Sequence, residues 1–337
     1  YVILSCWSPG PWTTDLKFCQ LFEHFGLVKN IGPNISSVIE TMKKLGKKYN
    51  YLLAGYPPFC KELFEKGKSK INWKLYKIDV LVGGEGFALE WRKYVCKLAG
   101  KNMKIFSAYG ASDVDIAIAF ETPFSIFIRE LSSKNNGLRG VFCNNGRYPM
   151  IFQYNPLAHY INNIKNVNND GRIVDEFSIT PLDFNVSCPK IKYNIGDEGK
   201  KIGFREMGAL IDKHASKEFN NYLTKCKESL LHLPFLVIYG RSDGAISING
   251  TNIYPEQVER ALIMNNSLFS KVSTFRISSG GSKNARFIVN VELNKGVKVS
   301  KLLKKTVEKC LEKNMAIVSQ EFKQALEEFS RSIKPNV

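Results

Sequence analysis

Short apolar runs alternate with amphipathic segments over the first 238 residues of the chain. The apolar runs are bounded by Gly, Pro or Ser, which is typical of buried strands. They cover residues 1–6, 51–56 and 77–84. The amphipathic segments repeat apolar positions at helical spacing and cover residues 36–49, 57–67 and 88–100. This alternation predicts an α/β sheet flanked by helices, with ligand chemistry at the strand ends.

The later parts of the chain follow two further patterns. Residues 139–161 and 172–199 are dense in turns and β-prone residues, and we interpret them as a β-rich subregion joined to the α/β lobe. From residue 240 on, the pattern is that of a compact α+β unit. Its expected elements are a strand at 244–250, a helix at 254–265, a hairpin at 270–293, and helices at 298–313 and 319–333. The predicted fold class is α/β, with a large N-terminal lobe (1–239) and, after a hinge, a small α+β C-terminal domain (240–337).

The length of 337 residues exceeds what a single core usually holds, which favours two domains. No apolar run approaches the ~20 residues that span a bilayer, so we expect no membrane partner. Eight cysteines are scattered without a C-x-x-C pair, which argues against a zinc site or a disulfide framework and favours reduced thiols in a cytoplasm. Because the chain starts at Tyr1 rather than Met, we expect it to be an internal piece of a longer protein.

The net charge of +17 is compatible with nucleic acid, with phosphate-bearing ligands or with no specific partner. The lysines are dispersed and do not form one stripe with aromatic residues, which argues against nucleic-acid binding. One cluster overlies an expected amphipathic helix and comprises Lys295, Lys298, Lys301, Lys304, Lys305, Lys309 and Lys313. Leu302, Leu303, Val307 and Leu311 are predicted to face inward from this helix, which leaves the lysines on a solvated face.

Two short motifs follow strand-like runs in the first half of the chain. Residues 83–86 read Gly-Gly-Glu-Gly, and glycines at a strand end let a backbone approach a flat ligand closely. Residues 109–113 read Tyr-Gly-Ala-Ser-Asp, a set that can stack a base, hydrogen-bond a phosphate and hold a metal ion. Each motif alone is also compatible with an ordinary turn.

Two further motifs lie near the end of the large lobe. Gly196-Asp197 is predicted to close a strand, where a carboxylate can accept hydrogen bonds from two vicinal hydroxyls such as those of a ribose. A hairpin turn is the structural alternative. Residues 240–243 read Gly-Arg-Ser-Asp at the expected domain junction, and Arg241 is a fixed charge suited to an anion or a ribose. Asp243 lies where the two domains would pivot.

The four motifs occur in a fixed order and are followed by Gly250 and a Pro-Glu helix start. In this order they resemble the adenylate-forming superfamily of acyl- and aryl-CoA ligases. The segments AGYPPFCKEL and YPEQVERAL are similar to those of the phenylacetate–CoA ligase branch. The resemblance covers nearly the whole chain, and it implies ATP and AMP, Mg²⁺ and coenzyme A as ligands.

The resemblance also implies contacts to the nucleotide. Gly84 and Glu85 would border the adenine. Tyr109, followed by Gly110, would stack on it. Asp197 would accept hydrogen bonds from the ribose hydroxyls.

The remaining motif residues would act at the phosphates and at the hinge. Ser112 would lie near the α-phosphate. Asp113, at a position where the family usually has Glu, would help to hold Mg²⁺. Arg241 would contact the ribose and phosphate, and Asp243 would be the hinge residue.

The implied reaction has two halves. The carboxylate of a small acid attacks the α-phosphate of ATP and expels pyrophosphate, while fixed positive charge and Mg²⁺ stabilise the oxygens where negative charge accumulates. The small domain then swings, and a thiol, expected to be that of coenzyme A, attacks the acyl-adenylate. Two family features are not found: the Ser/Thr/Gly-rich phosphate loop and the adenylation lysine near the C-terminus, a role that we do not assign to Lys334. We interpret their absence as a result of truncation, and the flanking genomic sequence would show whether the natural protein carries them.

Several alternatives stay open at the level of the sequence. The chain could belong to an adenylating enzyme that loads an acyl carrier protein or forms an amide, in which case the basic helix would meet an acidic carrier. It could also be a nucleic-acid-binding protein, or a non-catalytic homologue that uses the fold as a binding module. The acid itself is not identified; Trp12, Tyr56 and Ala108 are candidate walls of its pocket. A homodimer is among the assemblies considered.

Overall fold

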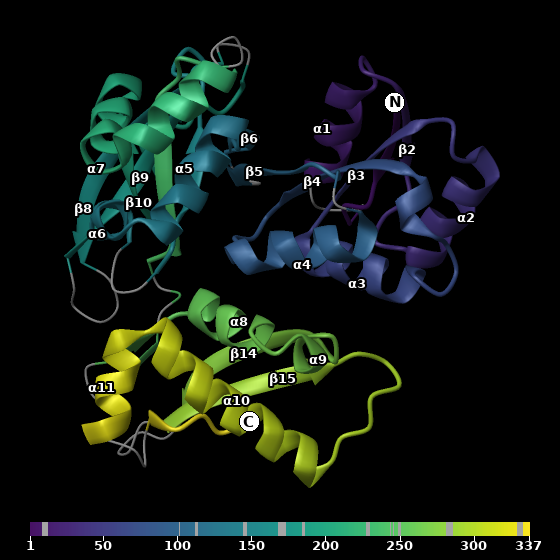
Figure 1. Ribbon diagram of the computed structural model, residues 1–337. Helices are drawn as coiled ribbons and strands as arrows, with labels where there is room; N and C mark the ends of the chain where they lie inside the picture. Colours follow the sequence, from purple (N-terminus) through teal and green to yellow (C-terminus); the bar gives the residue numbers. More distant parts are fainter. Residues whose placement is uncertain are drawn as a thin grey trace.

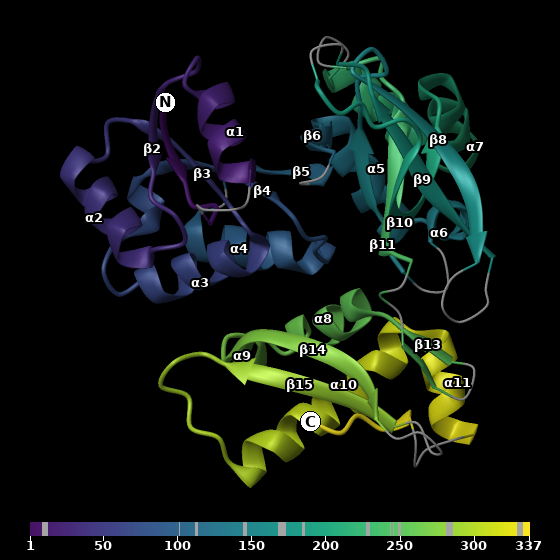
Figure 2. The same ribbon diagram turned by 180° about the vertical axis from the view of Figure 1, so that it is seen from behind.

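The computed structural model describes residues 1–8, 13–100, 102–111, 114–143, 147–167, 173–183, 186–226, 230–242, 244, 246–248, 251–280, 286–328 and 333–337. It consists of a large α/β lobe and a small α+β unit, which lies below the lobe in Figure 1. The view from behind in Figure 2 shows the small unit below the two halves of the large lobe. Within the described residues, every helix is either too short or too polar to cross a membrane.

The N-terminal half of the large lobe is a parallel sheet in the order β2-β1-β3-β4-β5. Its strands are β1 (Val2–Ser5), β2 (Leu27–Asn30), β3 (Asn50–Gly55), β4 (Lys77–Gly83) and β5 (Ile105–Ala111). The connecting helices are α1 (Thr13–Phe22), α2 (Ile35–Leu45), α3 (Pro57–Gly67), the 3₁₀ helix η1 (Trp73–Leu75) and α4 (Leu89–Ala99). β1 is buried throughout because its successive side chains face two layers. Ile3 packs with Phe18 of α1, whereas Val2 and Leu4 join the core that α2, α3 and α4 cover.

The second half of the lobe extends the same sheet with antiparallel strands, to eleven in all. They are β6 (Asp115–Phe120), β7 (Met150–Gln153), β8 (His159–Val167), β9 (Ile173–Pro181), β10 (Tyr193–Ile202) and β11 (Phe235–Arg241), in the order β6-β7-β11-β10-β9-β8. The predicted β-rich subregion is therefore continuous with the α/β part. The two halves meet where β5 pairs with β6, with Tyr109 opposite Ala119, and β5 runs from one half toward the other (Figure 1).

Helices α5 (Pro123–Lys134), α6 (Asn136–Phe142) and α7 (Phe204–Cys226) cover one face of this antiparallel half. β11 again divides its side chains between two layers. Phe235 and Val237 pack under these helices, whereas Leu236 and Ile238 join the main core. The start of α5 is fixed by a capping box between Thr122 and Ser125.

The small unit begins after β11. Its elements are β12 (Ile246–Ile248), β13 (Thr251–Ile253), α8 (Pro255–Ile263), α9 (Asn266–Phe269), β14 (Val272–Gly280), β15 (Arg286–Leu293), α10 (Lys301–Val318) and α11 (Gln320–Glu328). The strands form two antiparallel hairpins, β12-β13 and β14-β15. α8 starts with Pro255 at its first turn, as expected from the sequence, and packs against α10, where Asn314 Nδ2 donates to the carbonyl of Ala261 at 2.9 Å.

Two predictions about single positions are wrong. Leu302 does not face inward: it is 76% exposed. The buried stripe of α10 includes Val307 and Leu311, and Leu302 lies five residues before Val307, about 140° round the helix. Gly196-Asp197 does not close a strand, because β10 continues to Ile202 and keeps pairing with β11.

Candidate active site

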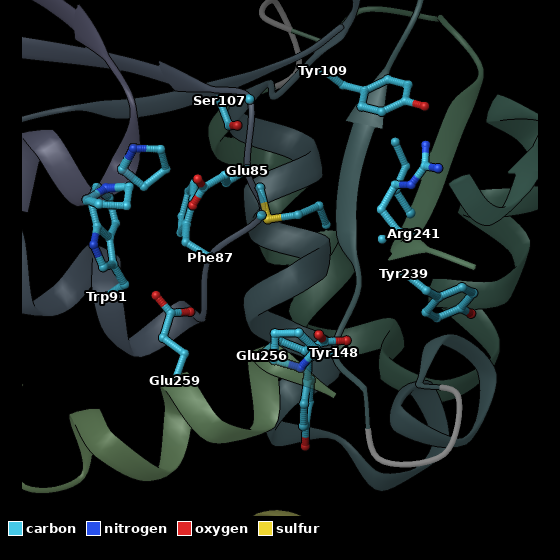
Figure 3. Close-up of a pocket in the computed structure, with 18 of the residues that line it drawn as sticks. Glu85, Phe87, Trp91, Ser107, Tyr109, Tyr148, Tyr239, Arg241, Glu256 and Glu259 are labelled. Carbon is cyan, nitrogen blue, oxygen red and sulfur yellow. The ribbon is translucent and has the colours of Figure 1, made fainter. Parts of the chain in front are cut away.

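A cavity of about 610 Å³ lies between the large lobe and the small unit. Its walls come from the loop after β4, from β5, β10 and β11, and, on the side of the small unit, from α8 and β14. The described residues predicted for nucleotide contact all line it: Gly84, Glu85, Tyr109, Gly110, Asp197 and Arg241. Figure 3 shows Glu85, Tyr109 and Arg241 around this space.

Three polar side chains, remote in sequence, meet on one side of the cavity. The hydroxyl of Tyr109 donates a hydrogen bond to Asp197 Oδ2 at 2.6 Å. Asp197 and Arg241 are opposite each other on β10 and β11, and Arg241 Nη1 donates to the carbonyl of Ile195. The ring of Tyr109 lies beside Phe152, with centroids 5.9 Å apart. The predicted convergence of the three residues is thus present, while their roles stay predictions.

A glycine before Asp197 allows this close approach. Gly196 has φ of +78°, in the region that side chains disfavour. A Cβ at this position would lie 3.1 Å from Arg241 Nη2. The backbone carbonyl of Gly196 also accepts a hydrogen bond from the amide of Ser242 at 2.9 Å. Gly196 therefore lets the guanidinium of Arg241 lie flat over β10.

A buried arginine, Arg129, stabilises the loop after β4 through backbone hydrogen bonds. Arg129 Nη2 donates to the carbonyl of Phe87, and Arg129 Nε donates to the carbonyl of Pro149 at 2.8 Å. Burial lowers the pKa of Arg129 to about 10, so the guanidinium is still charged at neutral pH. In the loop itself, Gly84 has φ of +81°, and a Cβ there would lie 2.9 Å from the ring of Tyr56.

The cavity also contains acids that the sequence analysis did not assign. Glu256 and Glu259 of α8 line it, three residues apart on one helix face. Glu85, which was predicted, lines the same cavity. Burial raises the pKa of Glu85. Burial also raises the pKa of Glu259 to about 7, although the amide of Ala88, which donates to Glu259 Oε2 at 2.8 Å, and the charge of Arg129 act in the opposite direction. The only sequence signal for Glu256 and Glu259 was their spacing within YPEQVER.

A buried lysine at the edge of the cavity was likewise missed. Lys61 of α3 is 4% exposed and lines the cavity. Its Nζ donates to the carbonyl of Val272 in the small unit at 2.6 Å and lies 4.3 Å from the centroid of the Phe269 ring. Burial lowers the pKa of Lys61, while Glu65, 3.4 Å from Nζ, acts against that shift. Lys61 is therefore a polar contact between the two bodies.

Four predicted residues, namely Ser112, Asp113, Asp243 and Trp12, lie outside the described residues. Among the residues that are described, no group of three or more His, Cys, Asp or Glu side chains could hold a metal ion. Of the other candidate walls of the acid pocket, Ala108 lines the cavity. Tyr56 packs edge-on against Trp7, with ring centroids 4.7 Å apart.

No family model and no curated protein matches the sequence. Solved structures do match. A 2-hydroxyisobutyryl-CoA ligase in the postadenylation state, in complex with R3-HIB-AMP, superposes with a TM-score of 0.63 at 14% identity, over 95% of this chain. The chain has the fold of the adenylate-forming ligases.

Two other solved structures are also similar to the chain. The anthranilate CoA ligase AuaEII in complex with anthranoyl-AMP has a TM-score of 0.57 at 12% identity, over 94% of this chain and 54% of that one. The ATP-bound RpMatB-BxBclM chimera has a TM-score of 0.55 at 12% identity, over 92% of this chain and 53% of that one. The chain spans 60% of the length of the 2-hydroxyisobutyryl-CoA ligase.

Proposed function

We propose that this chain is part of an acid–CoA ligase that adenylates a small carboxylic acid with ATP and then forms a thioester with coenzyme A. The observation that supports this most is the meeting of Tyr109, Asp197 and Arg241 in one cavity between the two bodies. The similar structures include CoA ligases in complex with R3-HIB-AMP and with anthranoyl-AMP, which belong to the same class of reaction.

The residues around the cavity fit a nucleotide. The ring of Tyr109 offers a flat face for an adenine, and Gly84 of the loop after β4 lines the same cavity. A carboxylate such as that of Asp197 can accept several hydrogen bonds at once, and ribose hydroxyls are suitable donors. The guanidinium of Arg241 supplies a permanent positive charge for a phosphate oxygen.

In the first half-reaction, a carboxylate oxygen of the acid forms a bond to the α-phosphorus, and the bond from that phosphorus to the pyrophosphate oxygen breaks. Arg241 would stabilise the charge on the phosphate oxygens as this happens. A bound Mg²⁺ would supply further charge neutralisation at the phosphates. We propose Asp113 as its ligand and Ser112 as a hydrogen-bond donor near the α-phosphate.

In the second half-reaction, a thiolate attacks the acyl carbon and AMP leaves. We propose coenzyme A as the thiol, in a ligase of the phenylacetate–CoA type. We further propose the division of the chain into 1–239 and 240–337, with Asp243 as the hinge residue. The alternative acceptor is an acidic carrier protein, for which the exposed lysines of α10, including Lys301, Lys305 and Lys309, would be the contact.

The setting of the enzyme is also a proposal. All eight cysteines are free thiols, which supports a reducing compartment such as the cytoplasm. We include a homodimer among the proposed assemblies. Light scattering of the purified protein, which measures the molar mass in solution, tests it.

The decisive measurement is ATP–pyrophosphate exchange by the full-length protein with a panel of aryl and alkyl carboxylic acids. We expect exchange with at least one acid, and a CoA thioester as the product when coenzyme A is added. Asp197→Asn should lower exchange at least tenfold, because the ribose loses a charged acceptor, in line with the roughly 1.5–3 kcal/mol of a charged hydrogen bond.

The matched control is Asp175→Asn, an exposed position on the neighbouring strand β9. It should leave exchange within twofold of the wild type. Absence of exchange with every acid would count against the proposal, as would equal effects of the two substitutions. If the acyl group is found on a carrier protein but not on free coenzyme A, the proposed adenylation stands and only the proposed acceptor changes.

A further inference from the structure

Arg147 lies where the strands of the candidate site meet the small unit, and its side chain is 2% exposed. Its Nη1 donates to Glu198 Oε2 at 2.6 Å, and its Nε donates to Glu256 Oε1 at 2.8 Å. Its Nη2 donates to the backbone carbonyl of Tyr239. The ring of Tyr254 covers the guanidinium, with the ring centroid 4.1 Å from Cζ. One side chain thus contacts β10, β11 and α8.

The two partners in the large lobe are chain neighbours of the proposed nucleotide residues. Glu198 follows Asp197 on β10, and Tyr239 lies two residues before Arg241 on β11. The two strands pair Asp197 with Arg241 and Glu198 with Gly240. A guanidinium that binds Glu198 and the carbonyl of Tyr239 therefore fixes the spacing between Asp197 and Arg241.

The third partner belongs to the small unit and is held differently. Glu256 stands in the first turn of α8 and is 30% exposed, whereas Glu198 is 8% exposed. Water can solvate Glu256 when its contact with Arg147 breaks, so releasing this arm costs less than releasing the buried Glu198 would. Glu198 stays in place as the counter-ion, so Arg147 is not left buried without a partner. The contact to the small unit is thus the one that can open.

Burial by itself would lower the pKa of Arg147, but Glu256 and Glu198 raise it above its usual value. Its charge is therefore fixed at every physiological pH, and only movement of a partner can change the contact.

We propose that Arg147 is a positioning residue that couples the orientation of the small unit to the geometry of the nucleotide site. This inference rests on the proposed function. With Glu256 bound, the small unit closes the cavity and the strands that carry Asp197 and Arg241 are held for adenylation. With Glu256 released, the small unit can reorient for the thiol step, while Glu198 keeps Arg147 in place.

The test compares Glu256→Gln with Glu90→Gln. Glu90 of α4 pairs with Arg260 of α8 at 3.2 Å and is 35% exposed, so it is an ion pair between the same two bodies that does not involve Arg147. Glu256→Gln should lower the maximal rate of pyrophosphate exchange three- to tenfold, keep the KM for ATP within twofold, and not slow thioester formation from preformed acyl-adenylate. Glu90→Gln should stay within twofold of the wild type in all three.

A third variant separates the two arms of the guanidinium. Glu198→Gln weakens the arm inside the large lobe, so it should raise the KM for ATP at least fivefold. Equal effects of Glu256→Gln and Glu90→Gln, or an unchanged exchange rate in Glu256→Gln, would overturn the coupling.

A readout without catalysis keeps this inference apart from the proposed function. The radius of gyration from solution scattering should increase in Glu256→Gln relative to both the wild type and Glu90→Gln, because one contact between the bodies is lost. If wild-type protein exchanges pyrophosphate but Glu256→Gln scatters like the wild type, the coupling is wrong and the function stands. If no acid supports exchange, the proposed function fails, and scattering still decides whether Arg147 holds the two bodies together.

Discussion

Gly84 and Gly46 have almost the same φ, +81° and +82°, but different surroundings. A Cβ at Gly84 would meet the ring of Tyr56 at 2.9 Å, whereas a Cβ at Gly46 would meet nothing within 4 Å. We expect Gly46→Ala to lower the free energy of unfolding by about 1 kcal/mol, from the backbone conformation alone. Gly84→Ala should cost roughly 1–3 kcal/mol more, because the ring of Tyr56 must move.

Urea denaturation of the two variants measures this difference. Nucleotide binding is the second readout, since only Gly84 lines the cavity. If both variants lose the same stability and bind AMP like the wild type, the Tyr56 contact has no role in shaping the loop.

Single residues were predictable from the sequence where a chemical type stands out in a motif. Tyr109, Asp197 and Arg241 stood out because each is a polar residue next to a glycine in a strand-like run, a combination with few structural uses. Arg147 and Lys61 did not, because their partners, such as Glu256 and Val272, come from distant segments of the chain. The residues next to a buried charged residue in the sequence do not indicate which distant carbonyl or carboxylate will be its hydrogen-bond partner.

At the scale of elements, α8 carries a titration that should be visible in stability. The pKa of Glu259 is raised to about 7 in the folded protein, mainly by burial, from an ordinary value of 4.5. Between these values the unfolded chain has lost the proton that the folded protein keeps, so stability falls as pH rises through this window and stays low above it. Arg129 and Lys61 attract the carboxylate form, and Glu85 and Glu256 repel it.

Glu259→Gln removes this titration, and its amide oxygen can still accept from the amide of Ala88. We expect the variant to be more stable than the wild type by about 1–2 kcal/mol at pH 8, after allowing for partial exposure, and equal to it near pH 5. Thermal unfolding across pH 5 to 8 checks the sign. A less stable variant at pH 8 would mean that the attraction of Arg129 outweighs the burial.

Elements with strong periodicity were predicted within a few residues. The strands β1 and β4 and the helices α3, α4 and α8 fall inside the segments expected from their patterns, whereas β3 and α2 each begin one residue before theirs. α7 was not predicted, because its apolar positions are sparse and Ala215 interrupts the helical backbone. The prediction for Leu302 was wrong because two leucines in succession at the start of a helix do not indicate which of the two faces the core.

At the scale of the molecule, Lys61 joins the large lobe to the small unit and should contribute strongly to stability. Lys61→Met keeps the approximate length of the side chain but removes the cation beside Glu65, which keeps its hydrogen bond from Tyr94, and the donor to the carbonyl of Val272. We expect a loss of about 2–4 kcal/mol in the free energy of unfolding, because one member of a buried pair is removed.

The matched control is Lys66→Met on the same helix, where Lys66 pairs with Glu62 at a partly exposed position. It should change stability by less than about 0.5 kcal/mol. Thermal or urea unfolding compares the two variants. Similar losses in both would show that the contact of Lys61 with the small unit carries no special weight.

The whole arrangement was predictable in outline. Alternating strands and helices followed by a different pattern predicted a large α/β lobe and a small α+β unit. The order of strands was out of reach, because β7 pairs with β11, which lies far along the chain. The depth of the cavity was also out of reach, since α8 and β14 complete walls that begin at β4 and β5.

The pairing of β7 with β11 has a consequence for synthesis of the protein. Strands of the parallel half find partners made shortly before or after them, so this half can collapse while later residues are still inside the ribosome. β7 is almost wholly apolar, and the nascent chain offers its outer edge to other chains until Phe235–Arg241 has emerged. A pause in translation before that point would prolong the time during which the chain depends on chaperones.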